Sequence, residues 1–287
     1  MIGFVGIACV FVMVFGGYLM AGGKIDIILK SLPYEMTMIG GAAVGAFLLS
    51  NAFGDVKKAL KDVTRVFKGS RWTTDDYRDL LCLLHELIRL ARQNPVELEG
   101  HIEAPAESSL FAEFPRIAAD KAAVDLICDT LRAMSMNYDD PHQLEEMLDK
   151  RIEELREHDL HSSHALQVVA DGLPALGIVA AVLGVIKTMG SIDQPPEVLG
   201  KLIGGALVGT FLGVFLAYGI VGPMATRLSG IAREDGQLYG LIREVLVANL
   251  HGHATGMCVE VGRQNAPAHH RPNFAAIEEA LRARKAA

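Results

Sequence analysis

Residues 202–226 read Leu-Ile-Gly-Gly-Ala-Leu-Val-Gly-Thr-Phe-Leu-Gly-Val-Phe-Leu-Ala-Tyr-Gly-Ile-Val-Gly-Pro-Met-Ala-Thr, without one charged side chain. A helix of about 20 mostly apolar residues crosses the ~30 Å hydrocarbon core of a bilayer. Because this run exceeds that length, we predict a membrane-spanning helix over 202–226. Its many glycines are typical of helices that pack closely inside a membrane.

Three further apolar runs predict three more spans. Residues 2–21 are uncharged, and the uncharged run 36–53 places a second span at about 34–53. A third span over 172–192 requires Lys187 to extend its amine to the membrane interface. A buried helix of a soluble domain is the alternative for this run, but the short loop to residue 202 favours a membrane hairpin.

The distribution of basic residues predicts the orientation, because cytoplasmic flanks are enriched in Lys and Arg. Those after the second and fourth spans are Lys57, Lys58, Lys61, Arg65, Lys68, Arg71, Arg227 and Arg233. We therefore expect both termini to be cytoplasmic and the outer loops to be short.

The remainder of the chain predicts helices, because apolar residues recur at helical spacing. The expected helices cover 55–68, 73–93, 118–136 and 142–159, with a short one from Phe274. The predicted fold is an all-α integral membrane protein with four transmembrane helices, a large helical cytoplasmic loop and a helical cytoplasmic C-terminal segment. The corresponding segments are 1–53 (spans one and two), 54–171 (loop), 172–226 (spans three and four) and 227–287 (C-terminal segment).

Composition and motifs exclude several function classes. The net charge of -7 argues against nucleic acid as a partner. The sequence has no GxSxG elbow, Walker A lysine or HExxH motif, so we expect neither an enzyme nor a bound cofactor. The four scattered cysteines predict reduced thiols. The grouped histidines, which indicate a solvated surface and no metal site, are His158, His161, His164, His251, His253, His269 and His270.

The predicted spans contain polar groups but lack the acid that an ion path needs. Ion pathways usually need an ionisable group inside the membrane, and we find no Asp, Glu or His in the middle of a predicted span. Thr210 and Tyr218 supply polar groups in span four, and Asp171 lies at the inner end of span three. If the chain moves ions, we expect the carboxylate to come from another protein.

Two prolines fall at matching depths of the predicted hairpin. Pro174 opens span three and Pro223 lies near the inner end of span four. Pro174 is either an N1 residue or a conformational element. For Pro223 we expect a kinked or flexible exit, because apolar sequence continues on both sides.

One stretch carries a family resemblance. From Ala206 the sequence reads Ala-Leu-Val-Gly-Thr-Phe-Leu-Gly-Val-Phe, followed after seven residues by Pro223. This resembles the signature of the MotA family of flagellar stator proteins, in the MotA/TolQ/ExbB proton channel superfamily. Similar stretches are Asp171-Gly-Leu-Pro-Ala-Leu-Gly-Ile-Val-Ala-Ala181, Phe114-Pro-Arg-Ile117, Asn249-Leu-His-Gly252 and Glu260-Val-Gly-Arg263.

The resemblance implies a role in bacterial flagellar motility and chemotaxis. A ring of such chains, five in related stators, would surround two MotB-type chains in the inner membrane. Each MotB-type chain would supply an ion-binding aspartate, and ion flow would generate torque on the rotor protein FliG. The resemblance and the span analysis together give six candidates for channel lining or conformational change, namely Pro174, Pro223, Thr210, Tyr218, Ala180 and Asp171.

The resemblance also implies rotor contacts by an arginine and a glutamate of the cytoplasmic loop. The matching stretch is Arg92-Gln-Asn-Pro-Val-Glu-Leu-Glu99, although the family usually has one more residue between the pair. Arg92 and Glu99 are the candidates, with Arg89, Glu97 and Glu103 as alternates. On local sequence alone, a solvated charged helix end is the other interpretation.

Two further expectations concern the transported ion and the class of function. Residues 178–184 offer no hydroxyl beside Thr210, so we expect H⁺ rather than Na⁺, which needs several oxygen ligands. The alternative function is an ExbB/TolQ-type proton-driven energiser of an outer-membrane system, which would have three spans. A solute transporter would need inverted repeats, and we find none.

Overall fold

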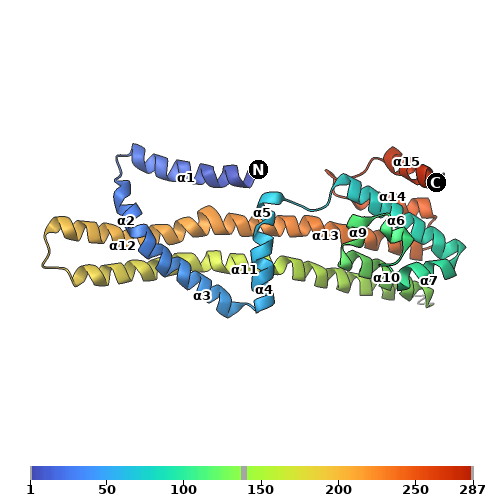
Figure 1. The fold of residues 1–287 in the computed structure, drawn as a ribbon, viewed down its shortest axis with the longest axis horizontal. Helices are drawn as coiled ribbons and strands as arrows, with labels where there is room; N and C mark the ends of the chain where they lie inside the picture. The colour runs from blue at the N-terminus through green and yellow to red at the C-terminus, as the bar shows by residue number, and fades with distance from the viewer. Residues whose placement is uncertain (1, 137–140, 286–287) are drawn as a thin grey trace. The chain divides into compact units, whose positions relative to one another are not determined.

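The structure is a computed structural model that describes residues 2–136 and 141–285, and the regular structure within these residues is helical (Figure 1). The chain divides into two compact units. The membrane unit comprises Met1–Gly69 and Leu160–Ile231, and the polar unit comprises Ser70–Asp159 and Ala232–Ala287. These borders differ from the predicted ones at 54, 171 and 227, because the membrane unit includes the first helices and turns beyond the apolar runs.

Four helical stretches are long and apolar enough to cross a membrane, so the four predicted spans and the all-α fold are confirmed. Their elements are α1 (Ile2–Met20), α2 (Ile25–Glu35), the π-helix η1 (Met36–Gly40), α3 (Gly41–Ser50), α11 (Pro141–Met189), α12 (Pro196–Leu216), the π-helix η2 (Ala217–Val221) and α13 (Gly222–Leu250). In Figure 1, α11 and α12 form an antiparallel hairpin.

The second span begins nine residues earlier than predicted, at Ile25 rather than about 34. Pro33 suggests a helix boundary, but the helix contains it and continues into the wide turn of η1. A π-type turn of this kind accommodates a local interruption of the i→i−4 hydrogen bonds without ending the helix. Glu35 therefore lies near the middle of the span Ile25–Ser50, and the prediction that no Asp, Glu or His occurs in the middle of a span is wrong.

The third and fourth spans belong to helices longer than their apolar runs. Residues 141–189 form one helix, so the separate helices predicted over 142–159 and 172–192 are continuous. Pro174 lies inside this helix and is not its N1 residue. Span four begins at Pro196 rather than 202. The predicted borders mark a change in side-chain polarity, which does not interrupt backbone hydrogen bonding.

The exit of span four is irregular, as predicted. The wide turn of η2 ends directly before Gly222 and Pro223, and α13 continues to Leu250. A proline ring clashes with the carbonyl four residues earlier, here that of Gly219, which lies within η2. Because η2 widens this turn, the helix continues past Pro223.

The segment after the third helix differs from its prediction. Instead of one helix over 55–68, α4 (Phe53–Val63) and α5 (Arg65–Lys68) are separated at Thr64. Asp62, on the buried face of α4, accepts a 2.8 Å hydrogen bond from Ser162 of α11. Gly69 ends α5 with φ +89°, the left-handed conformation that glycine adopts without strain. Gly69 is thus the C-cap of α5.

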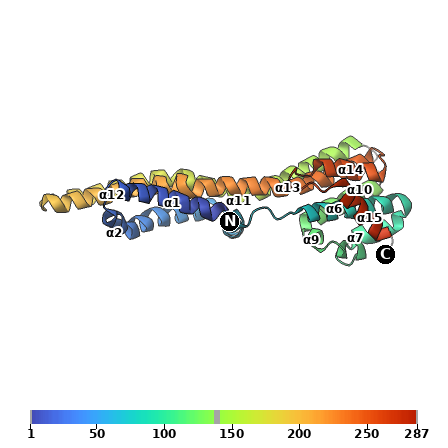
Figure 2. The same ribbon diagram turned by 90° about the horizontal axis from the view of Figure 1, so that it is seen from above.

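The polar unit contains α6 (Thr74–Gln93), which Figure 2 shows together with the other short helices of this unit. The other helices are α7 (Pro95–Glu103), α8 (Ser109–Ala112), α9 (Pro115–Ala118), α10 (Lys121–Ser135), α14 (Thr255–Asn265) and α15 (Phe274–Lys285). The predicted helix over 118–136 is shorter, because Asp120 caps α10 by accepting a hydrogen bond from the Ala123 amide. The starts predicted at Thr73 and Phe274 are confirmed to within one residue.

A buried ionic cluster lies in the polar unit. Asp235, which is 0% exposed, accepts hydrogen bonds from the Ser70 hydroxyl and the Arg71 amide. The Arg71 guanidinium lies 2.7 Å from Asp120 and donates to the Tyr239 hydroxyl. Burial disfavours the charged guanidinium, but Tyr239, Asp120 and Asp235 outweigh it and raise the pKa of Arg71.

Candidate functional site

The hairpin of α11 and α12 is held by glycines on both helices. A Cβ on Gly177 would stand 2.8 Å from the Gly209 carbonyl oxygen, and one on Gly213 would stand 2.7 Å from that of Leu173. Farther along, a Cβ on Gly184 would stand 2.6 Å from the Ala206 Cβ. The two backbones therefore approach more closely than larger side chains would allow, the packing that small residues give in membranes.

One side of α12 and of the following η2 is left open in the single chain, and we call it the hairpin face. Its members recur at helical spacing and are Ile203, Leu207, Thr210, Val214 and Tyr218. Tyr218 is 70% exposed and Thr210 is half-buried. Neither 172–186 nor 202–226 contains an Asp or Glu, so the hairpin face offers hydroxyls and apolar groups but no carboxylate.

The other channel candidates occupy different positions. Ala180 is 1% exposed, and its Cβ lies 3.2 Å from the position that a Gly209 Cβ would take. Pro174 is half-buried, whereas Pro223 is exposed. Asp171 is exposed and accepts a 2.8 Å hydrogen bond from Gln167. Thr210, Tyr218 and Pro223 thus remain accessible, while Ala180 lies between helices; their channel role stays a prediction.

Glu35 is the functional candidate that sequence reasoning missed. Its side chain is 5% exposed, inside the membrane unit. The signal was available, because Ile27, Ser31 and Glu35 repeat at intervals of four as one face of a helix. Interpreting residues 22–33 as a loop hid that spacing.

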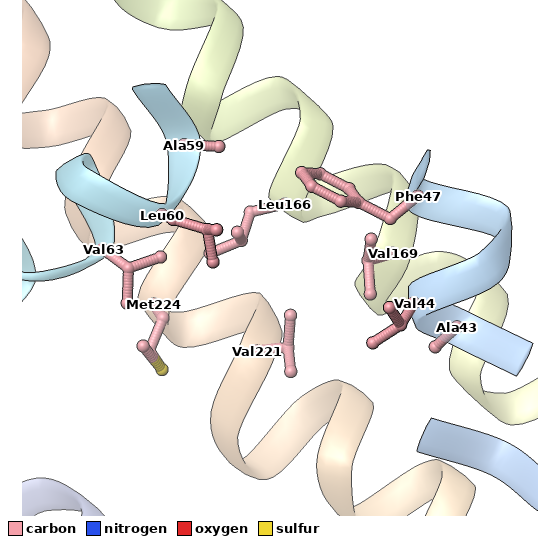
Figure 3. A pocket seen from close by; sticks show the side chains of 10 residues that line it. All are labelled: Ala43, Val44, Phe47, Ala59, Leu60, Val63, Leu166, Val169, Val221 and Met224. Atoms are coloured by element: carbon pink, nitrogen blue, oxygen red, sulfur yellow. The ribbon is translucent and has the colours of Figure 1, made fainter. Parts of the chain in front are cut away.

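A purely apolar cavity of about 250 Å³ lies elsewhere in the membrane unit. Figure 3 shows its side chains converging from several helices: Ala43, Val44, Phe47, Ala59, Leu60, Val63, Leu166, Val169, Val221 and Met224. This lining suits hydrocarbon and offers nothing to bind an ion.

The main rotor-contact candidates lie near one end of α6. Arg92 donates to the Asn249 side-chain oxygen at 2.6 Å and to the His253 carbonyl, so its guanidinium joins α6 to the end of α13. Glu99 is an exposed residue of α7 with no ion pair among the described residues. Asn94 caps α7 between them. Both charges are at the surface, but only Glu99 lacks an internal role.

The alternates have internal partners. Arg89 lies 2.6 Å from Glu86, and Glu103 lies 2.6 Å from Arg132. Glu97 accepts a 2.9 Å hydrogen bond from Asn94. These contacts give the three alternates a structural role whatever else they bind.

The grouped histidines were predicted to lie on a solvated surface and the cysteines to be reduced thiols. His158, His161 and His164 are exposed. His269 and His270 lie beside Glu234, with 2.7 Å from His269 to the carboxylate, a group that could also hold a cation. The four cysteines are free thiols, and burial raises the pKa of the three that lie in the polar unit, Cys82, Cys128 and Cys258. Burial raises the pKa of Cys82 to about 11 and that of Cys128 to about 12, so both stay protonated.

Comparison with known proteins agrees with this arrangement. The profile described as "Motility protein A N-terminal" matches residues 4–95, and that of the "MotA/TolQ/ExbB proton channel family" matches residues 118–239. Motility protein A of Escherichia coli is 40% identical, with 95% of this chain and 92% of the relative covered. Chemotaxis protein LafT of Vibrio parahaemolyticus is 34% identical, with 97% of each covered.

Solved structures share the fold. A chain of the C. jejuni MotAB structure has a TM-score of 0.69 at 19% identity, covering 93% of this chain and 95% of that one. A chain of the Bacillus subtilis flagellar MotAB stator complex has a TM-score of 0.69 at 21% identity, covering 96% and 100%. The relatives are channel proteins rather than enzymes. The chain is a multi-pass inner-membrane protein that belongs to the motility protein A family.

Proposed function

We propose that the chain is the stator subunit of an ion-driven flagellar motor. With a MotB-type partner it forms a transmembrane proton path and converts proton flow into torque on the rotor protein FliG. The observation that carries this proposal is the hairpin face, which is exposed in the single chain and contains no carboxylate. Glycines hold the helix behind this face in close contact with α11. Such a surface suits one wall of an ion path that is completed by another chain.

The partner would supply the missing acid. A helix with an aspartate facing Thr210 and Tyr218 would place an ion-binding carboxylate against the hydroxyls of the hairpin face. The solved relatives named as MotAB complexes support such a partner for this chain. The proposed assembly is a ring of five copies around two partner helices, with both termini and the polar unit in the cytoplasm.

Protons are the proposed ion. Of the residues from Ile178 to Gly184 on α11, none carries a hydroxyl. Thr188, nearer the end of α11, donates its hydroxyl to the Gly184 carbonyl at 2.9 Å. Sodium requires several oxygen ligands, whereas a proton needs a single acid.

An ExbB/TolQ-type energiser is the second candidate, because the proton channel profile covers that group too. Two observations favour the flagellar role: the match of residues 4–95 to the motility protein A N-terminal profile and the four spans. A three-span topology is expected of the energiser.

Deletion of the gene tests the proposal. The deletion strain should assemble normal filaments and fail to rotate them, and expression of the chain should restore swimming. Normal swimming after deletion, or loss of the filaments themselves, would contradict a stator role.

Charge reversal at Arg92 and Glu99 tests the rotor contact. We expect Arg92→Glu and Glu99→Lys each to reduce the expansion of swimming colonies in soft agar, while membrane insertion stays normal. Exposed ion pairs contribute about 0–1 kcal/mol each, so each reversal should weaken swimming without abolishing it. Unchanged swimming would remove both residues from the contact.

Asn249→Ala is the matched control for Arg92. It removes the acceptor that holds the guanidinium within the chain but keeps the positive charge. If the charge acts on the rotor, Asn249→Ala should swim much better than Arg92→Glu. If both variants lose swimming to the same extent, the role of Arg92 is its contact with α13 within the chain.

A further inference from the structure

Glu35 is a buried acid that has no hydrogen-bond partner for its Oε2 atom among the residues that the structure describes. Its side chain is 5% exposed. It also forms no ion pair with any residue in 2–136 or 141–285. Buried acids are normally paired or hydrogen-bonded, and those inside a membrane usually serve a function.

The carboxyl group lies where three membrane helices meet. Oε2 of Glu35 is 2.7 Å from the position that a Cβ on Gly209 would occupy. The Ala180 Cβ and the Ala181 amide nitrogen each lie 3.2 Å from that same position. The acid of α2 therefore fills space that glycine leaves on α12, beside α11.

This position is set by a wider contact between α2 and α12. A Cβ on Gly204 would stand 3.4 Å from Ile27, and a Cβ on Gly205 would stand 3.0 Å from the Ser31 hydroxyl. The ridge formed by Ile27, Ser31 and Glu35 thus follows a line of glycines on α12. Because two other residues fix the helix in place, the inward position of Glu35 is part of the packing.

Glu35 is also close to the proposed ion path. Gly209 directly precedes Thr210, a member of the hairpin face. Consecutive helical residues lie about 1.5 Å apart along the axis. The acid therefore stands at the level of Thr210, on another side of the same helix.

The charged groups of the surrounding helices leave this acid unpaired. Those on α2, on α12 and on the adjacent part of α11 are Asp26, Lys30, Glu197, Lys201, Asp171 and Lys187, and α1 carries none. None of them forms an ion pair with Glu35. An unpaired carboxylate in an apolar interior is far less favourable than a neutral carboxyl group, so this position favours the acid with its proton bound.

We propose that Glu35 is a proton-binding site of this chain, which takes up and releases a proton as the stator conducts. This rests on the proposed function. Uptake forms one O–H bond on the carboxylate with a proton from water, and release breaks that bond and returns the proton to water. The chain would then contribute an acid of its own in addition to the partner's aspartate.

Glu35→Gln tests the proposal, because glutamine keeps the shape of the neutral acid but cannot release a proton. We expect tethered cells that carry Glu35→Gln with the partner to lose most of their rotation rate, with normal insertion and partner co-purification. Glu35→Asp should rotate, with the midpoint of its rate-against-pH curve shifted to lower pH by about 0.4 unit, the difference between the reference pKa values of Asp and Glu. Asp26→Asn, which changes an exposed acid of the same helix, is the control and should match the wild type.

Wild-type rotation and an unchanged pH profile in Glu35→Gln would overturn the proposal and leave Glu35 a packing residue. An independent measurement is the infrared carbonyl band of protonated carboxyl groups in the purified full chain. We expect a band at neutral pH that disappears on alkaline titration and is absent from Glu35→Gln. Identical spectra for the two chains would also overturn it. If the wild-type chain inserts but never restores rotation, the stator proposal fails and the infrared result alone decides the role of Glu35.

Discussion

Gly177→Ala is expected to lose most of its swimming, although it adds only one methyl group. The new Cβ would stand 2.8 Å from the Gly209 carbonyl oxygen and 3.1 Å from the Gly213 Cα. Both atoms are backbone, so α11 and α12 can relieve the clash only by moving apart. Overpacking of this kind costs about 1–3 kcal/mol. Separation of the helices would also displace Thr210 and the rest of the hairpin face.

The chain contains a matched control for this substitution. Gly172 lies on the same helix, and a Cβ there would meet nothing within 4 Å. Alanine favours helix by about 1 kcal/mol over glycine, so Gly172→Ala should swim normally. The measurement is colony expansion in soft agar, with immunoblots of the membrane fraction. Equal swimming by the two variants would show that the close helix contact is unimportant.

Asp235→Ala is expected to destabilise the polar unit by about 3–5 kcal/mol, the cost of breaking a buried ionic cluster. The aspartate is fully buried, and its removal leaves the Ser70 hydroxyl and the Arg71 amide without their acceptor. It also removes one of the carboxylates that stabilise the Arg71 guanidinium, while Asp120 stays at 2.7 Å. A large part of the stability of a typical domain would be lost.

Trp72 provides the measurement for this second prediction. It is the single tryptophan of the chain, is 4% exposed and lies under the Arg71 guanidinium at 4.7 Å. Its fluorescence during urea unfolding of the purified full chain should give a lower midpoint for Asp235→Ala. Glu146→Ala, which removes an exposed ion pair with Lys150, should change the free energy by about 0–1 kcal/mol. Similar midpoints for the two variants would contradict a stabilising role of the buried cluster.

Much of the fold could be predicted from the sequence because a membrane imposes simple requirements. Long apolar runs, one of them including Lys187, predicted the four spans, and helical spacing after the Thr73 cap predicted α6. Helix ends were less predictable. A change from apolar to polar side chains marks where a helix leaves the hydrocarbon, but α11 and α13 continue because their backbone hydrogen bonds do not depend on polarity.

The site could be predicted only in part, since local sequence reveals residue types and not their neighbours. Thr210 and Tyr218 were recognised as polar groups of an apolar helix, and both lie on the hairpin face. Glu35 was missed because the second span was predicted to begin at about residue 34, whereas the helix begins at Ile25 and places Glu35 near the middle of the span. The contact of Arg92 with Asn249 joins residues 157 positions apart, a distance that periodicity does not span.

The central claim is that this chain and a MotB-type partner together form a proton path that drives rotation. The most direct test is the rotation rate of tethered cells that lack their own stator proteins and express this chain, the partner or both. We predict rotation only with both, at a rate that follows the proton-motive force and is unchanged when external Na⁺ is varied at fixed pH. Rotation with this chain alone, or a rate proportional to Na⁺, would contradict the account.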